Sequence, residues 1–256
     1  MLTGKKGIIF GIANNHSIAW GIGKKLKENG ATLGITYQNE TFLKRVQPLA
    51  KELNSELLIK CDFSNKIDLN KCFQEISDKW KSIDFIIHAV AYSDKAELNG
   101  RYITTSKENF INTLNISCYS FTKIANLSAP LMPNGGSLIT LTFYGSNKVI
   151  PSYNIMGIAK AALETSVKYL SVDLGNKNIR VNAISAGPMR TLSGAVIGKS
   201  REVYKFTKEN SPLKRNVYLE EIGNTATYLV SNMSAAITGE IHYVDCGYNI
   251  IGMPKI

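Results

Sequence analysis

Short apolar runs alternate with longer amphipathic runs along the whole of this 256-residue sequence. A short run such as IDFIIHA, at residues 83–89, has almost no polar alternation, which is typical of a strand that helices cover on both faces. A longer run such as residues 67–80 repeats its apolar side chains at helical spacing. Strands that alternate with helices in this way predict an α/β fold, with a doubly wound parallel sheet.

The predicted strands and helices fill the sequence with no linker, repeat or low-complexity segment between them. The predicted strands cover residues 7–12, 31–37, 56–61, 83–89, 137–142, 180–185 and 240–244. The predicted helices cover residues 18–29, 42–53, 67–80, 106–129, 152–174 and 220–231. We therefore expect a single Rossmann-type, nucleotide-binding domain over residues 1–256. Residues 191–211 form an insertion after a strand, and we expect a helical lid there, over the substrate-binding crevice.

The composition has 30 Lys and Arg residues against 20 Asp and Glu residues, for a net charge of +10. This surface favours an acidic partner, such as nucleic acid, anionic lipid, an acidic protein or a phosphorylated ligand. A nucleic-acid binder would need a basic stripe interleaved with aromatic residues or a recognition helix, and the sequence offers neither. No apolar run approaches the ~20 residues that span a bilayer, so no membrane partner is expected.

The four cysteines, at positions 61, 72, 118 and 246, form no CxxC pair and have no histidine spaced to share a metal ion. We expect reduced thiols, no metal site and a cytoplasmic location. The basic, apolar start of the chain resembles a signal segment, but no small-residue cleavage site follows, so a buried first strand is the better interpretation.

The turn after the first predicted strand is placed to bind a phosphate, because free amides and the helix dipole attract an anion there. Only Gly11 stands in this turn, with Ser17 as the expected N-cap. The turn lacks the GxGxxG pattern, so a capped turn without a ligand remains an alternative. After the second strand, Gln38 can hydrogen-bond a ribose hydroxyl and no arginine is adjacent, which favours NADH over NADPH. Asp62 is placed to accept from an adenine amine, or else to cap the next helix.

Tyr153 and Lys160 carry the strongest chemical signal in the sequence. Seven residues turn a helix through about 700°, some 20° short of two turns, so both side chains are predicted to share one helix face. A nearby ammonium would lower the pKa of the tyrosine and make it a proton donor to a carbonyl or an enolate. A packed tyrosine beside a solvated lysine is the alternative. His88, inside an apolar run, is expected to be a core residue.

The sequence resembles the short-chain dehydrogenases/reductases in RVNAISAGP at 180–188, and in TGE at 238–240 followed by VD at 244–245. A Tyr-x6-Lys spacing, together with GxxxxxSIA in the first turn, resembles one divergent branch, the bacterial enoyl-acyl carrier protein reductases of type II fatty acid synthesis. Six segments fit that branch in order: GIANNHSIAWGI, TYQNE, CDFSN, SYNIMGIAKAALE, RVNAISAGPMRTL and GEIHYVDCG.

The resemblance implies an NADH-dependent oxidoreductase that reduces a trans-2-enoyl thioester on acyl carrier protein. Hydride would pass to the β-carbon, Tyr153 would hold the enolate oxygen, and Lys160 would bind the nicotinamide ribose. Ser93, Tyr153 and Met156 would contact the substrate. The implied cofactor residues are Gly11, Ser17, Ile18, Gln38, Asp62, Phe63, Val90, Lys160, Met189, Arg190, Thr191, Leu192 and Ser193. The long helix over 106–129 pairs between subunits in the superfamily, which implies a homotetramer.

Two positions depart from the family pattern. The family carries a second active-site tyrosine ten positions before the first, where this sequence has Phe143. Tyr144 follows directly, so either the second tyrosine is dispensable or Tyr144 replaces it from a shifted loop; both residues remain catalytic candidates. The segment Ala89–Ala91 replaces a more usual Ser-Ile-Gly.

Two other functions are weighed against enoyl reduction. A carbonyl reductase of the same superfamily would favour Tyr-x3-Lys and a serine thirteen positions before the tyrosine, where this sequence has Thr140. A dinucleotide sensor without catalysis would be expected to have lost Tyr153 or Lys160.

The excess charge is concentrated near the predicted lid. Residues 190–215 hold seven basic and two acidic side chains, a net +5, half of the total. An acidic carrier protein is therefore expected to dock there, with a solvated charged face as the alternative. The candidate docking residues are Lys199, Arg201, Lys205 and Lys208.

Overall fold

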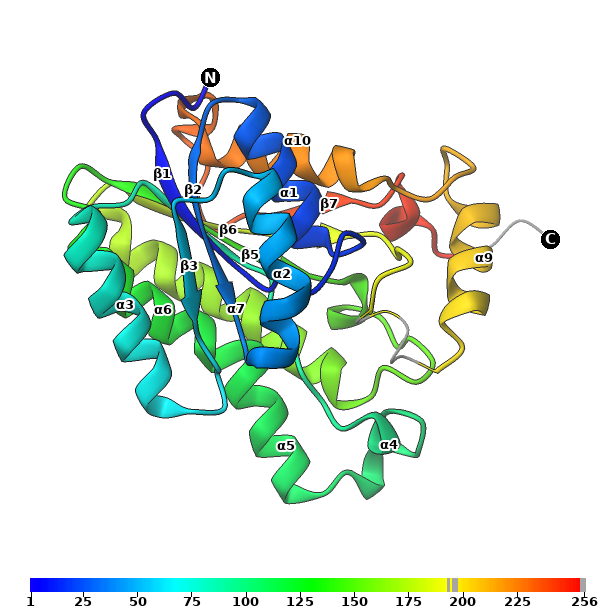
Figure 1. Cartoon of the computed structure of the whole chain (residues 1–256). Coiled ribbons are helices and arrows are strands. Elements are labelled where there is room, and N and C mark those ends of the chain that lie inside the picture. The colour runs from blue at the N-terminus through cyan, green and yellow to red at the C-terminus, as the bar shows by residue number, and fades with distance from the viewer. Residues whose placement is uncertain (193, 195–197, 254–256) are drawn as a thin grey trace.

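A seven-stranded parallel sheet forms the centre of the protein, as predicted (Figure 1). The computed structural model describes residues 1–192, 194 and 198–253. The strand order is β3-β2-β1-β4-β5-β6-β7, and every neighbouring pair is parallel. The strands are β1 (Lys6–Phe10), β2 (Thr32–Tyr37), β3 (Leu57–Lys60), β4 (Phe85–His88), β5 (Gly136–Thr142), β6 (Ile179–Ala186) and β7 (Ile241–Val244).

Helices cover both faces of the sheet. The principal helices are α1 (Ile18–Glu28), α2 (Glu40–Glu52), α3 (Lys66–Trp80), α5 (Lys107–Leu114), α6 (Ser120–Ser128), α7 (Ile155–Gly175), α9 (Ser200–Asn210) and α10 (Leu219–Val230). One buried cluster packs α3, α6 and α7 against one face of the sheet, and a second packs α1, α2 and α10 against the other. Because both faces are covered, the strands are apolar along nearly their whole length.

The strand order reverses at β1, which pairs with β2 on one side and β4 on the other. In an open parallel sheet this switch point opens a crevice at the carboxyl ends of the strands, and ligands bind there. The segments that follow β1, β4, β5 and β6 therefore converge on one site. No described helix is long and apolar enough to cross a bilayer.

Two helix predictions were wrong in detail, and one short helix was not predicted. The helix expected over 106–129 is interrupted by a π-helical turn at Asn115–Tyr119. The helix expected from residue 152 begins at Ile155, because residues 151–154 form turns. The sequence also gave no sign of the one-turn helix α4 (Lys95–Leu98). Within the insertion at 191–211, α9 supplies the expected helix.

Candidate active site

The turn after β1 is shaped by Gly11 and Ser17. Gly11 has a φ of +104°, and a Cβ at this position would collide with the carbonyl oxygen of Ala89. Ser17 is the N-cap of α1, as predicted, but its Oγ accepts hydrogen bonds from the amides of Ala13 and Asn14 at 3.0 and 2.9 Å rather than capping α1. Gly11 and Ser17 thus fix the backbone of the turn beside the N-terminus of α1. A phosphate group binds favourably at such a helix N-terminus.

Gln38 and Asp62 lie side by side after β2 and β3. The Gln38 side-chain amide donates to both carboxylate oxygens of Asp62, at 3.3 and 3.4 Å. Asp62 also accepts from the amide and the hydroxyl of Ser64. The alternative role of Asp62 as a helix cap is not seen, because Asn65 is the N-cap of α3. Gln38 and Asp62 therefore lie together at the carboxyl edge of the sheet, where Gln38 is exposed and Asp62 is partly buried.

Several of the remaining cofactor candidates are partly buried at the same edge of the sheet. Phe63 packs edge-on against the rings of Phe10 and His88, with centroids 5.7 and 6.1 Å apart. Ile18 begins α1, and Val90 follows β4. The last group is the turn after β6: Met189, Arg190, Thr191 and Leu192 are described there, whereas Ser193 lies outside the described residues.

Tyr153 does not lie on α7, which corrects the prediction that it shares a helix face with Lys160. It occupies the turn before α7, and both of its neighbours have positive φ: Ser152 at +58° and Asn154 at +39°. The Tyr153 side chain is 5 % exposed and packs with Leu98, Ile155 and Met156. The tyrosine is therefore held by a specific turn and not by helical periodicity.

The pKa of Tyr153 moves in the opposite direction to the prediction. Burial raises it above the ordinary value of a tyrosine, and the negative charge of Glu164 raises it further. The hydroxyl is therefore neutral at physiological pH and keeps its proton. A neutral buried hydroxyl is suited to donate a hydrogen bond to an oxygen that gains negative charge.

Lys160 lies on α7 and is buried. Its Nζ donates to the carbonyl oxygen of Leu141 on β5 at 2.7 Å, which joins the helix to the end of the strand. Burial lowers the pKa of the Lys160 ammonium to about 8, while Cys118 and Glu164 act in the opposite direction. Tyr153 and Lys160 thus belong to one buried region, and both are influenced by the charge of Glu164.

Phe143 and Tyr144 face different partners, as expected for successive residues at a strand end. The Phe143 ring lies edge-on to the Tyr153 ring, with centroids 5.2 Å apart and planes at 72°. The Tyr144 ring packs instead against Tyr248, with centroids 5.8 Å apart. The phenylalanine, and not the neighbouring tyrosine, is the side chain that contacts Tyr153.

The substrate candidates Ser93 and Met156 are both buried. Met156 packs directly with Tyr153, and its Sδ accepts from the hydroxyl of Ser117 at 3.8 Å. Ser93 Oγ donates to Asn109 Oδ1 at 3.4 Å. Ser93 and Met156 are thereby connected to α5 and the π turn, respectively.

Glu164 was missed by the sequence analysis. It is one helical turn beyond Lys160, is buried, and accepts from the hydroxyls of Thr142 and Ser146 and the side-chain amide of Asn147. It thus anchors the turn that carries Phe143 and Tyr144. A carboxylate four residues after a candidate lysine, on the inner face of a helix, was the available signal.

His88 is fully buried, as expected of a core histidine. Its Nε2 lies 2.8 Å from Ser120 Oγ, and its Nδ1 lies 2.8 Å from Thr140 Oγ1. Burial lowers the pKa of His88 to about 3, and the charge of Lys160 adds to this effect. The Thr140 hydroxyl is therefore hydrogen-bonded to the buried imidazole of His88. This argues against Thr140 taking the place of the serine expected in a carbonyl reductase.

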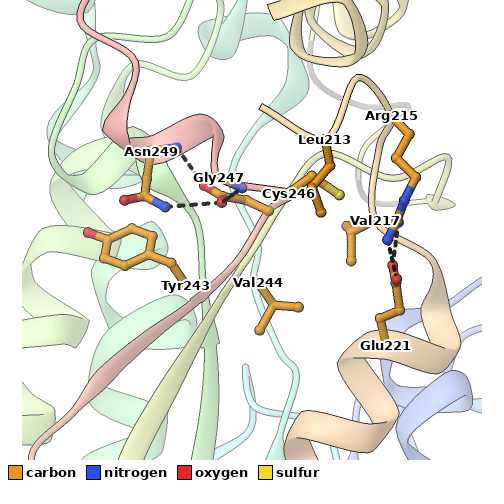
Figure 2. A pocket seen from close by; sticks show the side chains of 10 residues that line it. Leu213, Arg215, Val217, Glu221, Tyr243, Val244, Cys246, Gly247 and Asn249 are labelled. Atoms are coloured by element: carbon orange, nitrogen blue, oxygen red, sulfur yellow. Dashed lines mark hydrogen bonds and ion pairs between the residues drawn. The ribbon is translucent and has the colours of Figure 1, made fainter. Parts of the chain in front are cut away.

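An open pocket of about 270 Å³ lies at the carboxyl end of β7, and no candidate site residue lines it (Figure 2). Arg215 and Glu221 form a two-pronged ion pair on one side, with Nη–Oε distances of 2.8 and 2.6 Å. On the other side, Asn249 donates from its backbone and side chain to the carboxylate of Asp245. The polar groups of this pocket are thus largely paired with one another.

Comparison with known proteins places this geometry in a family. The family described as enoyl-(acyl carrier protein) reductase matches residues 11–249. An enoyl-[acyl-carrier-protein] reductase [NADH] of Rhizobium meliloti is 52 % identical over 256 residues, which is all of this chain and 94 % of the relative. A relative from Rickettsia felis with the same enzyme name is 53 % identical, over all of this chain and 98 % of its own length.

Solved structures agree with this assignment. A FabI crystal structure from Candidatus Liberibacter asiaticus has a TM-score of 0.97 and 54 % identity, over 99 % of this chain and 98 % of that one. An enoyl-acyl-carrier-protein reductase from Anaplasma phagocytophilum, solved in complex with NAD, has a TM-score of 0.96 and 51 % identity, over 100 % of this chain and 97 % of that one. Since sequence and fold agree over essentially the full length, the chain belongs to the enoyl-acyl carrier protein reductase family.

Proposed function

We propose that the protein is an NADH-dependent enoyl-acyl carrier protein reductase, which reduces a trans-2-enoyl thioester in the last step of the type II fatty acid elongation cycle. The observation that carries the proposal is that Tyr153 and Lys160 are both buried beside the carboxyl end of β5, in a chain that matches NADH-dependent relatives over its whole length. Carbonyl reduction is less well supported, because the Thr140 hydroxyl bonds His88.

The residues present fit a dinucleotide. Gly11 leaves space for a close approach to the backbone, because a side chain there would collide with Ala89. Gln38 and Asp62 offer an amide and a carboxylate to a ribose and an adenine, and Lys160 offers donors to the nicotinamide ribose. NADH, when bound, supplies the hydride that reaches the β-carbon of the substrate.

The chain's own groups would then stabilise the charge that develops on the thioester oxygen. The Tyr153 hydroxyl, kept neutral because burial raises its pKa, donates a hydrogen bond to that oxygen as it becomes an enolate. Lys160 adds positive charge from the adjacent helix face. Phe143 packs against the Tyr153 ring and supplies no proton, so in this mechanism one tyrosine serves the enolate.

A direct assay tests the proposal. Purified, folded protein is mixed with NADH and a short trans-2-enoyl thioester, and the loss of reduced nicotinamide absorbance is followed. Turnover is expected with NADH and much less with NADPH, because Gln38 offers no positive charge to a 2′-phosphate. Absence of turnover in both assays would reject the proposed reaction.

A second assay tests the role of the departure at Phe143. Phe143→Tyr restores the second tyrosine at the position where the family usually has one, with its ring against Tyr153. If one tyrosine suffices here, this variant should keep the wild-type turnover within about threefold. A large gain in turnover would show instead that the chain lacks a needed hydroxyl.

We also propose that α9 carries part of the docking surface for acyl carrier protein. Arg201, Lys205 and Lys208 are exposed on this helix, and Lys199 is exposed just before it. Within the part of the chain that the structure describes, the ion pair that Lys205 forms is long and exposed, with its Nζ 3.9 Å from Glu209 Oε1. These cations are therefore available to steer an acidic partner.

Charge reversal distinguishes docking from a merely solvated face. Replacing Lys199, Arg201, Lys205 and Lys208 with glutamate should raise the Michaelis constant for a carrier-bound substrate and leave that for a coenzyme A thioester unchanged. The effect should weaken at high ionic strength, because exposed charges are screened. Equal effects on both substrates would reject the docking surface.

A homotetramer in the cytoplasm completes the proposal. Ile111 on α5 and Tyr119 in the π turn are exposed, and so are Tyr169 and Val172 on α7. Such apolar side chains on neighbouring helices suit a subunit interface. Light scattering on the purified protein tests the tetramer, since a monomer would contradict it. The free cysteines support a reducing compartment.

A further inference from the structure

The turn that carries Tyr153 has an unusual backbone. Asn154 has a φ of +39° and a ψ of −120°, so its ψ lies outside the small left-handed region that L-residues can enter. Ser152, on the other side of Tyr153, also has a positive φ. Residues in such conformations persist only where the surrounding structure fixes them, and they cluster at functional sites.

The Asn154 side chain supplies a tie that fixes this turn. Its amide nitrogen lies 3.2, 3.1 and 2.9 Å from the carbonyl oxygens of Glu97, Leu98 and Gly100. The first two carbonyls belong to the last residues of the one-turn helix α4, where backbone oxygens have no partner within the helix, and Gly100 follows its C-cap. A single side chain therefore joins the turn of Tyr153 to a segment more than fifty residues earlier in the sequence.

The tied segment is itself held on its other side. The Glu97 carboxylate accepts from the amide and the hydroxyl of Ser106, at 2.8 and 2.7 Å, and from the Asn109 amide at 3.2 Å. Asn109 in turn accepts from Ser93 Oγ. The tie at Asn154 thus closes a series of contacts that runs from Tyr153 to the substrate candidate Ser93.

The insertion at 191–211 meets the same place at Gly198. A Cβ at Gly198 would collide with Asn99 Oδ1 and would lie 2.8 Å from Ser152 Oγ. The chain therefore passes against both the α4 segment and the turn of Tyr153 just before α9 begins. The α4 segment and the chain at Gly198 thus both meet the residues that flank Tyr153, although these three parts of the chain are distant in sequence.

We infer that Asn154 is a positioning residue for enoyl reduction: its amide ties the α4 segment to the turn before α7 and so fixes the Tyr153 hydroxyl where the enolate oxygen forms. The inference rests on the proposed function of Tyr153. It predicts that losing the amide lowers turnover more than cofactor binding, because Asn154 acts on the tyrosine and not on the cofactor turn.

Two substitutions separate the amide from the backbone. Asn154→Asp keeps the shape and loses the donor, while Asn154→Gly loses the side chain and accepts a positive φ. Both should lower kcat with the enoyl thioester by about ten- to a hundredfold, since a small displacement of a reacting group has effects of that size. The dissociation constant for NADH, measured by fluorescence, should stay within twofold of wild type.

Amide hydrogen exchange gives a readout that needs no activity. In both variants the peptide covering residues 95–104 should exchange faster than in wild type, because the tie to α4 is lost. If the wild-type protein fails to turn over, the proposed reaction fails, and the exchange measurement still tests the tie. If Asn154→Asp does not fold, Asn154→Gly provides the test, since glycine relieves the backbone.

Asn54 is a matched control, because it is an exposed asparagine with a φ of +47° in the turn between α2 and β3. Asn54→Asp and Asn54→Gly should leave kcat and the exchange of residues 95–104 unchanged. Wild-type kcat in Asn154→Gly would overturn the inference, and so would an NADH dissociation constant that rises as much as kcat falls. Unchanged exchange at residues 95–104 in both Asn154 variants would overturn it too.

Discussion

The proposed cofactor side and the proposed substrate side of the site are built in different ways. On the cofactor side, Gly11, Gln38 and Asp62 each follow the last residue of a strand by one or two positions. On the substrate side, Tyr153 sits in an irregular turn whose flanking residues both have positive φ. The first set is placed by the sheet itself, and the second by contacts between segments that are distant in sequence.

The two sides differ in what a sequence reveals about them: apolar periodicity predicts the first, whereas the second depends on contacts between distant segments. Apolar periodicity fixes where strands begin and end, and parallel strands deliver their carboxyl ends to one edge. The turn before α7 is instead held by Asn154 on one side and by the anchored turn after β5 on the other. Substitutions on the two sides should therefore fail differently, through cofactor binding on one and through turnover on the other.

The largest effect is expected from Tyr153→Phe. Removing one hydrogen-bond donor from a developing oxyanion costs about a hundred- to a thousandfold in kcat. NADH affinity should change little, because the phenylalanine keeps the packing against Phe143 and Met156. Steady-state turnover and NADH fluorescence titration measure the two quantities separately.

Tyr144→Phe is the matched control for that substitution. The Tyr144 ring packs against Tyr248 and not against Tyr153, so its kcat should stay close to wild type. If Tyr144→Phe lost as much turnover as Tyr153→Phe, then Tyr144 would be acting as the second tyrosine of the family, against its observed direction.

Gly11→Ala should cause the next largest loss, this time on the cofactor side. Its positive φ and the collision with Ala89 together should lower the free energy of unfolding by about 2–3 kcal/mol. The shifted turn should also weaken NADH binding. Gly4→Ala is the control, since Gly4 has a φ of +82° with no atom within 4 Å of an added Cβ. Gly4→Ala should lower the free energy of unfolding by only about 1 kcal/mol. Thermal melts measure both variants, and equal losses would show that the contact with Ala89 is unimportant.

The sheet and its helices were predictable because their signal is local and periodic. All seven strands were predicted with boundaries within about two residues, and the core position of His88 followed from its apolar neighbours. The strand-end residues Gln38 and Asp62 could be placed for the same reason. A packed α/β core demands this pattern whatever the ligand.

The turns and the electrostatics were not predictable in this way. A helix through Tyr153 satisfied the spacing to Lys160, but the chain enters α7 only at Ile155 because Asn154 bonds to the α4 segment. The pKa of Tyr153 is raised by burial and further by the charge of Glu164, and both depend on the packed structure. Glu164 was overlooked because its partners come from the turn after β5.

The pH dependence of the reaction should report Lys160. Its pKa in the folded protein is lowered to about 8, so its charge is lost as the pH rises through that value. The kcat/KM for NADH, which reports the free enzyme, should therefore fall by up to about tenfold per pH unit above 8. In the unfolded chain Lys160 keeps its proton to a higher pH. Between the folded and the unfolded pKa the unfolded chain therefore binds more protons than the folded protein, so the free energy of unfolding rises as the pH rises. The titration of Lys160 therefore lowers activity above pH 8 without unfolding the protein, and circular dichroism at each pH checks that the fold is intact.

Glu164→Gln sharpens this test from the substrate side. The negative charge of Glu164 raises the pKa of Lys160, so its removal should move the fall in kcat/KM to lower pH. Glu52→Gln, an exposed position on α2, is the control and should leave the profile in place. An unshifted profile in Glu164→Gln would mean that the titrating group is not Lys160.

The smallest effect is expected from Gln38→Ala. Gln38 is at the exposed rim of the cofactor side, and its bonds to Asp62 are long, at 3.3 and 3.4 Å. Loss of one exposed hydrogen bond costs about 0.5–1 kcal/mol, so the NADH dissociation constant should rise about threefold while kcat stays unchanged. Gln74→Ala is a matched control, because Gln74 also pairs with an aspartate, Asp78, but on the outer surface of α3. If Gln38→Ala lowered kcat and left NADH binding intact, a residue at a strand end would be acting on turnover. That outcome would contradict the distinction between the two sides of the site.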